Sequence, residues 1–231
     1  MEITRTSLGI PELDDLLNGG ILQGDPLLVS GRSGSGKTML ALQYLLHSAQ
    51  KGERGVYICI DDTPSKLMKI SKAIGWDFEP LLKSGSVSFL DVTQYFSTEH
   101  MINAPLSVDR LVDNILQFAQ DKRITRACID PCLPLCFLAQ SKSDICYYIR
   151  KLLFRLQDYE WCTPLLTLNT DFAPWVSSYM SSLVSGSIDL NHGIHESRRR
   201  LVIQKMSGTA VPIRQMAYDI IPKRGVVIRS G

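Results

Sequence analysis

The chain has 231 residues, of which 45% are apolar and 21% are charged, and its formal net charge is +2. This length and apolar content suit one large hydrophobic core, so we expect a single domain over residues 1–231. A net charge so close to zero gives no support, by itself, for a nucleic-acid partner.

Neither the N-terminus nor the apolar runs indicate a membrane protein. The first residues, Met1 to Arg5, do not read as a signal peptide. The apolar run at residues 131–139 is far shorter than the roughly 20 apolar residues that span a bilayer. We therefore expect a soluble protein of the cytoplasm with no membrane partner.

The cysteines fit that compartment, where thiols stay reduced. Cys128, Cys132 and Cys136 are spaced by four, which would suit a metal-binding helix face. Pro131 and Pro134 interrupt that stretch, however, and the chain contains no C-x-x-C pair. We therefore expect buried free thiols and no cysteine metal site.

The N-terminal segment leads from a short helix into a phosphate-binding motif. Pro11 suits a first helical position, and Gly19-Gly20 ends that helix. Residues 31–38 then read Gly-Arg-Ser-Gly-Ser-Gly-Lys-Thr, which is the P-loop pattern G-x-x-x-x-G-K-[ST]. The apolar run at residues 26–30 predicts the strand before it, and residues 39–50, rich in Leu and Ala, predict the helix after it.

The chemistry of the motif explains its residue types. Glycines let successive N–H groups point inward as a nest for phosphate oxygens. Lys37 would reach the β- and γ-phosphates, and the Thr38 hydroxyl would ligate Mg²⁺. The predicted nucleotide-binding residues are Gly31, Ser33, Gly34, Ser35, Gly36, Lys37 and Thr38.

An acidic pair follows the next predicted strand. Residues 56–60 form a β-run that ends in Asp61 and Asp62, and Thr63-Pro64 starts a helix that continues to residue 74. Asp62 or Thr63 would cap that helix. Residues 87–91 predict another strand, which also ends in an aspartate.

The middle of the chain alternates between helical and strand patterns. Residues 93–105 are polar and irregular, which indicates a surface loop. The strand over residues 124–130 ends in Asp130. The elements expected here are helices over residues 106–120, 144–159 and 177–183 and strands over residues 124–130 and 162–168.

The C-terminal part changes character, with short strands expected over residues 187–190, 201–206, 216–221 and 226–229. The alternation before it predicts βαβ units and an α/β fold with a mostly parallel sheet, to which these strands add an antiparallel extension. Because the P-loop, the acidic pair and Asp130 all follow strand ends, they are expected to meet at one ligand-binding edge.

These segments resemble the KaiC-like family of RecA-type P-loop ATPases, in the KaiC and RadA superfamily. Besides the P-loop and the acidic pair, the resemblance is carried by a double glycine at Gly19-Gly20 and by Gly75-Trp76-Asp77. It extends from Thr6 to about Ile228. It implies a RecA-like fold, ATP or ADP with Mg²⁺ as cofactors, and a homo-oligomer such as a hexamer-like ring or a filament. The preference for ATP over GTP rests on this resemblance alone.

The resemblance assigns roles to the acidic residues. Asp130 resembles a Walker B aspartate, which holds Mg²⁺ through water; the alternative is a turn or helix-cap aspartate. RecA-type proteins carry a water-positioning acid where Asp61 and Asp62 lie, and KaiC-like proteins commonly have two glutamates there. Since aspartate is one methylene shorter, the resemblance implies slow turnover. The alternative is that Asp62 only caps a helix.

Residues 205–208 read Lys-Met-Ser-Gly and resemble a segment that often reads Lys-x-Arg-Gly in KaiC-like proteins. There the basic side chains reach the γ-phosphate of the neighbouring subunit, so the resemblance implies a catalytic role for Lys205. Ser207 occupies the Arg position, and a hydroxyl does not replace a guanidinium. Pro131 is a second departure, since a hydroxyl residue usually follows the Walker B aspartate. The alternative for Lys205 is a solvated lysine on a strand.

Three functions remain open from the sequence. The first is a slow, oligomeric Mg·ATP-dependent ATPase. The second is a nucleotide-dependent regulatory or binding module with little or no hydrolysis, and its protein partner is unknown. The third is a recombinase-related DNA-binding accessory protein, suggested by the basic cluster at residues 198–200. It is not favoured, because no aromatic residue interleaves with that cluster and a hairpin turn at residues 195–197 also accounts for it.

Overall fold

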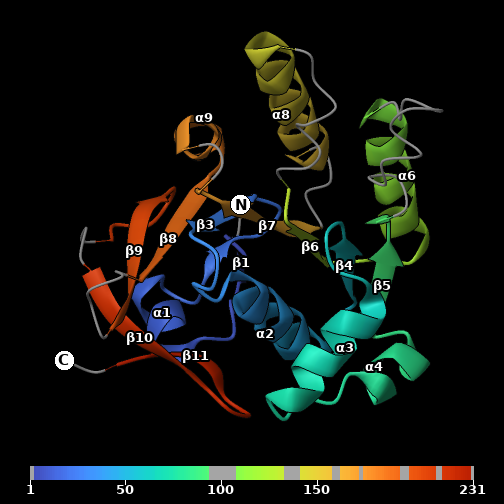
Figure 1. The fold of residues 1–231 in the computed structure, drawn as a ribbon, viewed down its shortest axis with the longest axis vertical. Helices are drawn as coiled ribbons and strands as arrows, with labels where there is room; N and C mark the ends of the chain where they lie inside the picture. Colours follow the sequence, from blue (N-terminus) through green and yellow to red (C-terminus); the bar gives the residue numbers. More distant parts are fainter. Residues whose placement is uncertain are drawn as a thin grey trace.

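A computed structural model describes residues 3–93, 108–132, 141–157, 162–171, 174–192, 198–211 and 215–229. Its centre is a nine-stranded sheet in the order β11-β10-β9-β8-β3-β7-β6-β4-β5 (Figure 1). The parallel strands are β3 (Leu27–Gly31), β4 (Gly55–Cys59), β5 (Val87–Asp91), β6 (Arg126–Asp130), β7 (Thr163–Asn169) and β8 (Gly186–His192). The antiparallel strands are β9 (Arg199–Met206), β10 (Gln215–Ile221) and β11 (Gly225–Ile228).

Helices cover both faces of this sheet (Figure 1). One face carries α1 (Pro11–Leu16), α2 (Lys37–Gln50), α3 (Pro64–Ala73) and α4 (Glu79–Ser84), and the other carries α6 (Val108–Asp121), α8 (Lys142–Gln157) and α9 (Pro174–Leu183). A small hairpin of β1 (Arg5–Thr6) and β2 (Ile21–Leu22) brackets α1. The predicted α/β fold with a C-terminal antiparallel extension is confirmed.

Strand alternation divides the core into two hydrophobic clusters. In β3, Leu27 and Val29 pack toward α2, whereas Leu28 packs toward the helices of the opposite face. Because both faces are covered, the central strands are buried on both sides and read as continuous apolar runs.

The antiparallel extension curls back over the P-loop helix. Gln43 of α2 accepts a hydrogen bond from the Val226 backbone N–H at 2.7 Å and donates one to the Gly9 carbonyl at 2.8 Å. Gly225 has φ +80°, and a Cβ there would lie 2.3 Å from the Gln43 Oε1 atom. The turn into β11 therefore requires glycine, since any side chain would displace Gln43.

Several boundaries differ from the sequence prediction. The six-residue helix α4 was not predicted, because it spans less than two turns and its N-cap residue, Phe78, has no capping side chain. Strand β6 begins at Arg126 instead of residue 124, and α9 begins at Pro174 instead of residue 177. The predicted loop over residues 93–105, apart from Thr93, and the predicted turn at residues 195–197 lie outside the described residues.

The cysteine prediction is confirmed for the buried thiols. Cys59, Cys128, Cys132 and Cys162 are free and buried, Cys146 is free and half-buried, and Cys136 lies outside the described residues. Burial raises the pKa of the Cys59 and Cys162 thiols to about 12, so they carry no reactive thiolate at neutral pH. In the part of the chain that the structure covers, no helix is long and apolar enough to cross a membrane.

Candidate nucleotide-binding site

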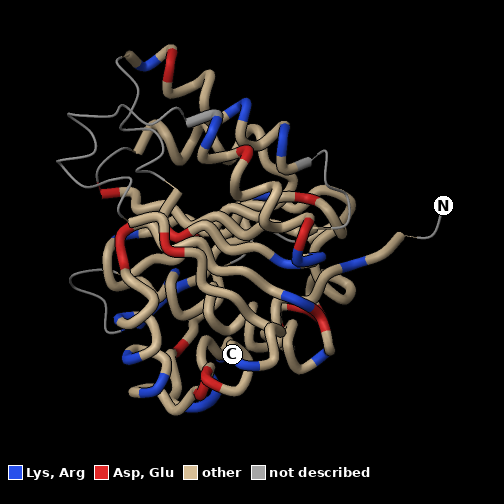
Figure 2. Tube along the Cα trace, turned by 90° about the vertical axis from the view of Figure 1, so that its right-hand side faces the viewer, with Lys and Arg blue, Asp and Glu red and all other residues tan. Residues whose placement is uncertain are grey.

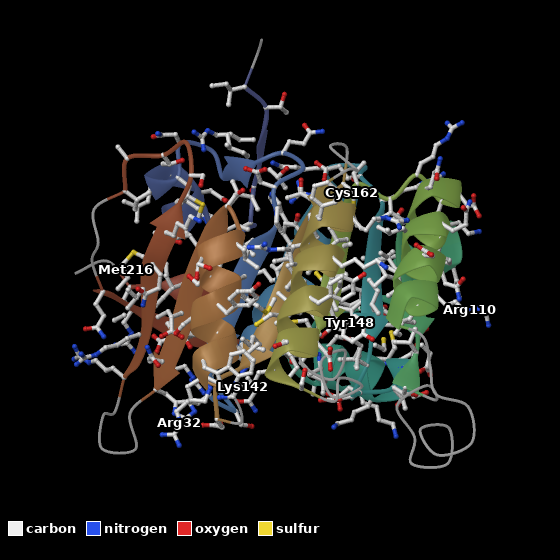
Figure 3. All side chains as sticks on the ribbon, turned by 90° about the horizontal axis from the view of Figure 1, so that it is seen from above. Arg32, Arg110, Lys142, Tyr148, Cys162 and Met216 are labelled. Carbon is white, nitrogen blue, oxygen red and sulfur yellow. The ribbon has the colours of Figure 1, made fainter. Side chains whose placement is uncertain are left out.

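The carboxyl ends of the parallel strands meet at one edge of the sheet, as predicted. Gly31 pairs in register with Asn169 of β7 and with Leu190 of β8, and Cys59 pairs with Asp130. Figure 3 shows the two edges: Arg32, in the P-loop, lies at the opposite end of the view from Cys162, which precedes β7. The P-loop follows β3 and the acidic residues follow β6 and β4, so they lie at the same edge of the sheet, with β7 between β3 and β6.

The backbone of the P-loop depends on its glycines. Gly34 and Gly36 have φ of +78° and +100°, in the left-handed region that favours glycine. A Cβ on Gly36 would lie 2.6 Å from the Cδ1 atom of Ile220 in β10. Gly36 also occupies the N-cap of α2, so the loop delivers its N–H groups to the positive end of that helix.

Lys37 is buried within its own loop. Its Nζ donates to the carbonyls of Gly31 and Arg32, each at 2.8 Å. Burial lowers the pKa of the Lys37 ammonium, while the carboxylates of Asp130, Asp171 and Asp189 oppose that effect. The ammonium is thus held at the loop by carbonyls, which are weaker partners than a phosphate.

Asp130 receives three hydroxyl groups. Thr38 Oγ1 donates to Asp130 Oδ2 at 2.8 Å, the Tyr57 hydroxyl donates to the same oxygen, and Thr167 Oγ1 donates to Oδ1. Burial of Tyr57, together with the charge of Asp130, raises the pKa of its phenol well above the usual value, so it stays a donor. The two side chains predicted to serve Mg²⁺, Thr38 and Asp130, therefore lie in direct contact.

The residues at this edge fit a nucleotide with its metal. Hydroxyl and carboxylate oxygens are the hard donors that Mg²⁺ prefers. The Ser35 hydroxyl is buried and has no hydrogen-bond partner among the described residues. An orphan hydroxyl inside a loop of the phosphate-binding pattern suits a phosphate oxygen.

The acidic pair divides into two different environments. Asp62 forms an ion pair with Lys66, four residues on in α3. Thr63 is the N-cap residue of α3 and accepts from the Lys66 backbone N–H at 3.3 Å. Helix capping by Asp62 was therefore a wrong alternative, because Thr63 occupies the N-cap position and its hydroxyl accepts the hydrogen bond there.

Asp61 follows the carboxyl end of β4, is solvent-exposed and has no hydrogen-bond partner in the described part of the chain. Desolvation raises the pKa of its carboxyl, the charges of Asp130 and Asp62 raise it further, and Lys66 lowers it. An unengaged carboxylate with a raised pKa, near the magnesium-type residues, has the properties of a group that accepts a proton from water.

Lys205 does not reach the P-loop of its own chain. It pairs in register with Ser187, near the amino end of β8, because β9 runs antiparallel and returns to that edge. Its Nζ donates to the carbonyl of Val184 at 2.7 Å, just beyond the end of α9. The turn after it is held by Arg5, which donates to the Gly208 carbonyl and to Thr209 Oγ1, each at 2.8 Å. A role for Lys205 toward a neighbouring subunit stays a prediction.

The basic cluster begins at the opposite end of the same strand. Arg199 pairs in register with His192, at the carboxyl end of β8. This places the start of the cluster on the P-loop edge of the sheet.

Sequence reasoning missed the residues that hold the tip of the P-loop. Asp171 accepts from the Ser33 backbone N–H at 2.9 Å and from Arg32 Nε at 2.8 Å, and these two donors lower the pKa of its carboxyl. His192 Nε2 donates to the Ser33 carbonyl at 2.9 Å. Asp171 follows a predicted strand by three residues, which was the available signal. Tyr57 lies inside an apolar run, and the sequence around it gives no signal of a functional role.

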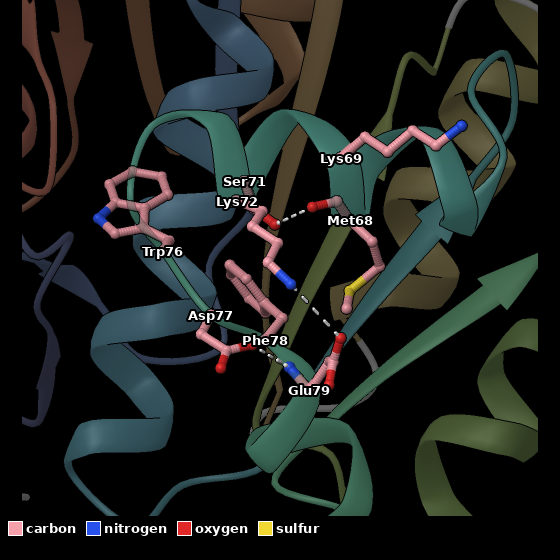
Figure 4. Close-up of a pocket in the computed structure, with 8 residues that line it drawn as sticks. All are labelled: Met68, Lys69, Ser71, Lys72, Trp76, Asp77, Phe78 and Glu79. Carbon is pink, nitrogen blue, oxygen red and sulfur yellow. Dashed lines mark hydrogen bonds and ion pairs between the residues drawn. The ribbon is translucent and has the colours of Figure 1, made fainter.

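A separate hollow of about 170 Å³ lies between α3 and α4 (Figure 4). Its lining residues are Met68, Lys69, Ser71, Lys72, Trp76, Asp77, Phe78 and Glu79. Several of its polar groups bond to each other, including Lys72 with Glu79 at 4.0 Å and the Glu79 N–H with Asp77 at 3.0 Å. It shares no residue with the P-loop edge and presents no orphan group to a ligand.

Comparison with known proteins agrees with this geometry. The model of the family described as the KaiC ATPase matches residues 6–231. A UPF0273 protein of Thermotoga maritima is 26% identical over 98% of this chain and 96% of its own length. The circadian clock protein KaiC3 of Synechocystis is 27% identical over 98% of this chain, which spans 46% of that protein.

A solved structure shares the fold. The crystal structure of a KaiC-like protein from the archaeon Pyrococcus horikoshii has a TM-score of 0.82 and 25% identity, with 99% of this chain and 100% of that chain covered. The family match extends over nearly the whole chain and includes every strand of the nine-stranded sheet. The chain therefore belongs to the KaiC family of ATPases.

Proposed function

We propose that the protein binds Mg·ATP or Mg·ADP at the carboxyl edge of its sheet, hydrolyses ATP slowly and works as a homo-oligomer. The observation that carries the proposal is the 2.8 Å contact between the Thr38 hydroxyl and the Asp130 carboxylate at the start of the P-loop helix. The match to the KaiC ATPase family supports nucleotide binding.

The P-loop supplies the phosphate site. The N–H groups that lead into α2 receive the phosphate oxygens, and the orphan Ser35 hydroxyl offers a further donor. Lys37 leaves its two carbonyl partners and turns to the phosphates, where a charge-assisted contact replaces two neutral ones.

Thr38 and Asp130 would hold the metal, with a hydroxyl and a carboxylate. Bound Mg²⁺ would supply neutralisation of the phosphate charge. Asp61, whose carboxyl is free, orients the attacking water and accepts its proton. Its short side chain limits the rate, since a misplacement of about 1 Å costs on the order of a hundredfold.

A nucleotide-dependent binding module without useful hydrolysis is the second candidate. Aspartates replace the usual glutamates, and Ser207 replaces the arginine that resembling segments carry. A site that binds but turns over poorly would act by the difference in partner affinity between its ATP and ADP states.

Self-association is part of the proposal because Lys205 lies far from its own P-loop edge. A neighbouring copy would bring its Lys205 to this site. Light scattering of about 20 μM protein with Mg·ATP should give a mass well above 25.8 kDa. A monomer mass with and without nucleotide would contradict it.

Nucleic acid is not part of the proposed function. Figure 2 shows Lys and Arg residues interspersed with Asp and Glu along much of the trace. The phosphate backbone of DNA is bound mainly by concentrated positive charge, with steep salt dependence. Salt-dependent binding to single-stranded DNA would restore that alternative.

Phosphate release tests the enzymatic part. Wild type should release phosphate from Mg·ATP slowly, and Lys37→Ala should release none above background. Equal rates in both proteins would assign the activity to a contaminant. Tight Mg·ATP binding without any release by wild type would favour the binding module.

A further inference from the structure

Tyr57 is buried in β4 and reaches across to the carboxylate at the end of β6. It is 1% exposed, and its ring stands edge-on to Phe89, with centroids 5.8 Å apart and an interplanar angle of 77°. In register it lies opposite Cys128, two residues before Asp130 on the same face of the sheet. The fixed ring therefore delivers its hydroxyl to Asp130 Oδ2 from one side.

Thr167 approaches the same carboxylate from the other side. Leu166 pairs in register with Ile129, so Thr167 of β7 follows beside Asp130. Its buried hydroxyl donates to Oδ1, the oxygen that Tyr57 does not use. Two donors from two flanking strands thus hold two different oxygens, which fixes the plane of the carboxylate.

The third donor differs from these two. Thr38 belongs to the P-loop, and its hydroxyl shares Oδ2 with Tyr57. An ionised carboxylate has about four lone-pair positions, so Tyr57 and Thr167 leave Oδ2 able to accept one more hydrogen bond. In the described residues no lysine or arginine forms an ion pair with Asp130, which leaves its negative charge available to a cation.

We propose that Tyr57 and Thr167 are positioning residues for Mg²⁺. They hold the Asp130 carboxylate so that the lone pair now used by Thr38 points to the water shell of the metal that arrives with the nucleotide. This inference rests on the proposed function, and it assigns no contact between either residue and the metal itself.

We expect substitutions of these residues to weaken the binding of Mg²⁺ and to leave the binding of phosphate groups by the P-loop unchanged. Groups that orient a metal-holding side chain typically contribute about 10- to 100-fold to metal affinity. Tyr57→Phe and Thr167→Val should therefore reduce, by about tenfold, the gain in ADP affinity that Mg²⁺ provides. ADP affinity in EDTA should stay unchanged, because the P-loop is untouched.

The test is a set of ADP titrations into the full chain, each performed with excess Mg²⁺ and with EDTA. Tyr44→Phe is the matched control: Tyr44 is equally buried, and its hydroxyl donates to the Thr163 carbonyl at 2.9 Å, at the other edge of the sheet. Thr167→Ser is the rescue variant, since it keeps the hydroxyl that Thr167→Val removes.

Every outcome decides the matter. The inference holds if Tyr57→Phe and Thr167→Val lower the Mg²⁺-dependent gain while Tyr44→Phe and Thr167→Ser retain it. It is overturned if Tyr57→Phe behaves like Tyr44→Phe, or if ADP affinity falls equally with and without Mg²⁺. Should Tyr57→Phe fail to fold, the two Thr167 variants give the answer alone. If wild type binds no ADP at all, the proposed function fails, and the inference fails with it.

Discussion

Two buried tyrosines donate hydrogen bonds at opposite edges of the same sheet. At the amino edge, the Tyr44 hydroxyl donates to the Thr163 carbonyl, and the guanidinium of Arg126 lies 4.9 Å from the centre of the Tyr44 ring. Arg126 is buried and forms an ion pair with Glu53. Positive and negative charges balance within this network, as stability requires of buried ions.

The carboxyl edge is built from similar residue types, but its buried carboxylate is not paired with a positive charge by an ion pair. Tyr57 donates to Asp130, which is only 8% exposed and accepts from hydroxyls, without an ion-pair partner in the described chain. The Lys37 ammonium acts on Asp130 electrostatically but donates its hydrogen bonds to the carbonyls of Gly31 and Arg32. A buried carboxylate without a directly paired cation is costly. The amino edge is therefore complete as folded, whereas the carboxyl edge has the properties we expect of a site that receives a cation together with an anion at the P-loop.

The largest effect should come from the proposed base. Asp61→Asn should lower ATP turnover about a thousandfold, because general-base catalysis typically contributes 10²- to 10⁴-fold. Nucleotide affinity should remain, since Asp61 contacts neither the P-loop nor Asp130 by a hydrogen bond. Steady-state phosphate release checks this, and Asp62→Asn, whose carboxylate pairs with Lys66, should lose much less. Unaltered turnover in Asp61→Asn would place the base elsewhere.

Lys37→Ala should weaken nucleotide binding at the carboxyl edge without disturbing the ion-pair network at the amino edge. The loss of the charge-assisted contact that Lys37 would make to the β-phosphate should weaken Mg·ADP binding about ten- to a hundredfold. Titration calorimetry measures it, and Lys69→Ala, an exposed lysine of α3, is the control. Equal affinity in wild type and Lys37→Ala would exclude the P-loop as the phosphate site.

Glu53→Gln should remove the ion pair with Arg126 at the amino edge and leave the carboxyl edge unchanged. It leaves the buried Arg126 without its counter-charge, which should lower the free energy of unfolding by about 2 kcal/mol, less than for a fully buried pair. The smaller value follows from the Glu53 side chain, which is 32% exposed. Chemical denaturation gives the free energy, and the Mg·ADP affinity of the folded variant should match wild type. A changed affinity would mean that the two edges are coupled.

The smallest effect concerns pH. The pKa of the Asp61 carboxyl is raised, first by desolvation and then by Asp130 and Asp62, so the ionised base appears only above the usual aspartate range. The pH at which turnover falls on acidification should therefore lie above the usual pKa range of aspartate. Asp62→Asn removes one negative neighbour, lowers the pKa of Asp61 and should make turnover fall at a lower pH. If the pH at which turnover falls rises or does not change in Asp62→Asn, Asp61 is not the base.

The sequence predicted the parallel core and the P-loop well because each depends on local residue patterns. Buried strands read as apolar runs, and the P-loop glycines are required by their own φ angles. The short helix α4 was not predicted, because six residues are too few to show a helical pattern of apolar residues.

Contacts between distant segments were harder to predict. Tyr57 and Thr167 meet Asp130 across 73 and 37 residues, and only the register of β4, β6 and β7 makes them neighbours. Likewise, the edge on which Lys205 lies follows from the antiparallel direction of β9, which residues 205–208 do not reveal by themselves.

We propose that the carboxyl edge binds nucleotide and Mg²⁺ together. An equilibrium titration of wild type with ADP, in excess Mg²⁺ and in EDTA, tests this most directly. We expect one site per chain and an affinity at least about tenfold higher with Mg²⁺. No binding at about 1 mM ADP, or an affinity that Mg²⁺ does not change, would contradict it.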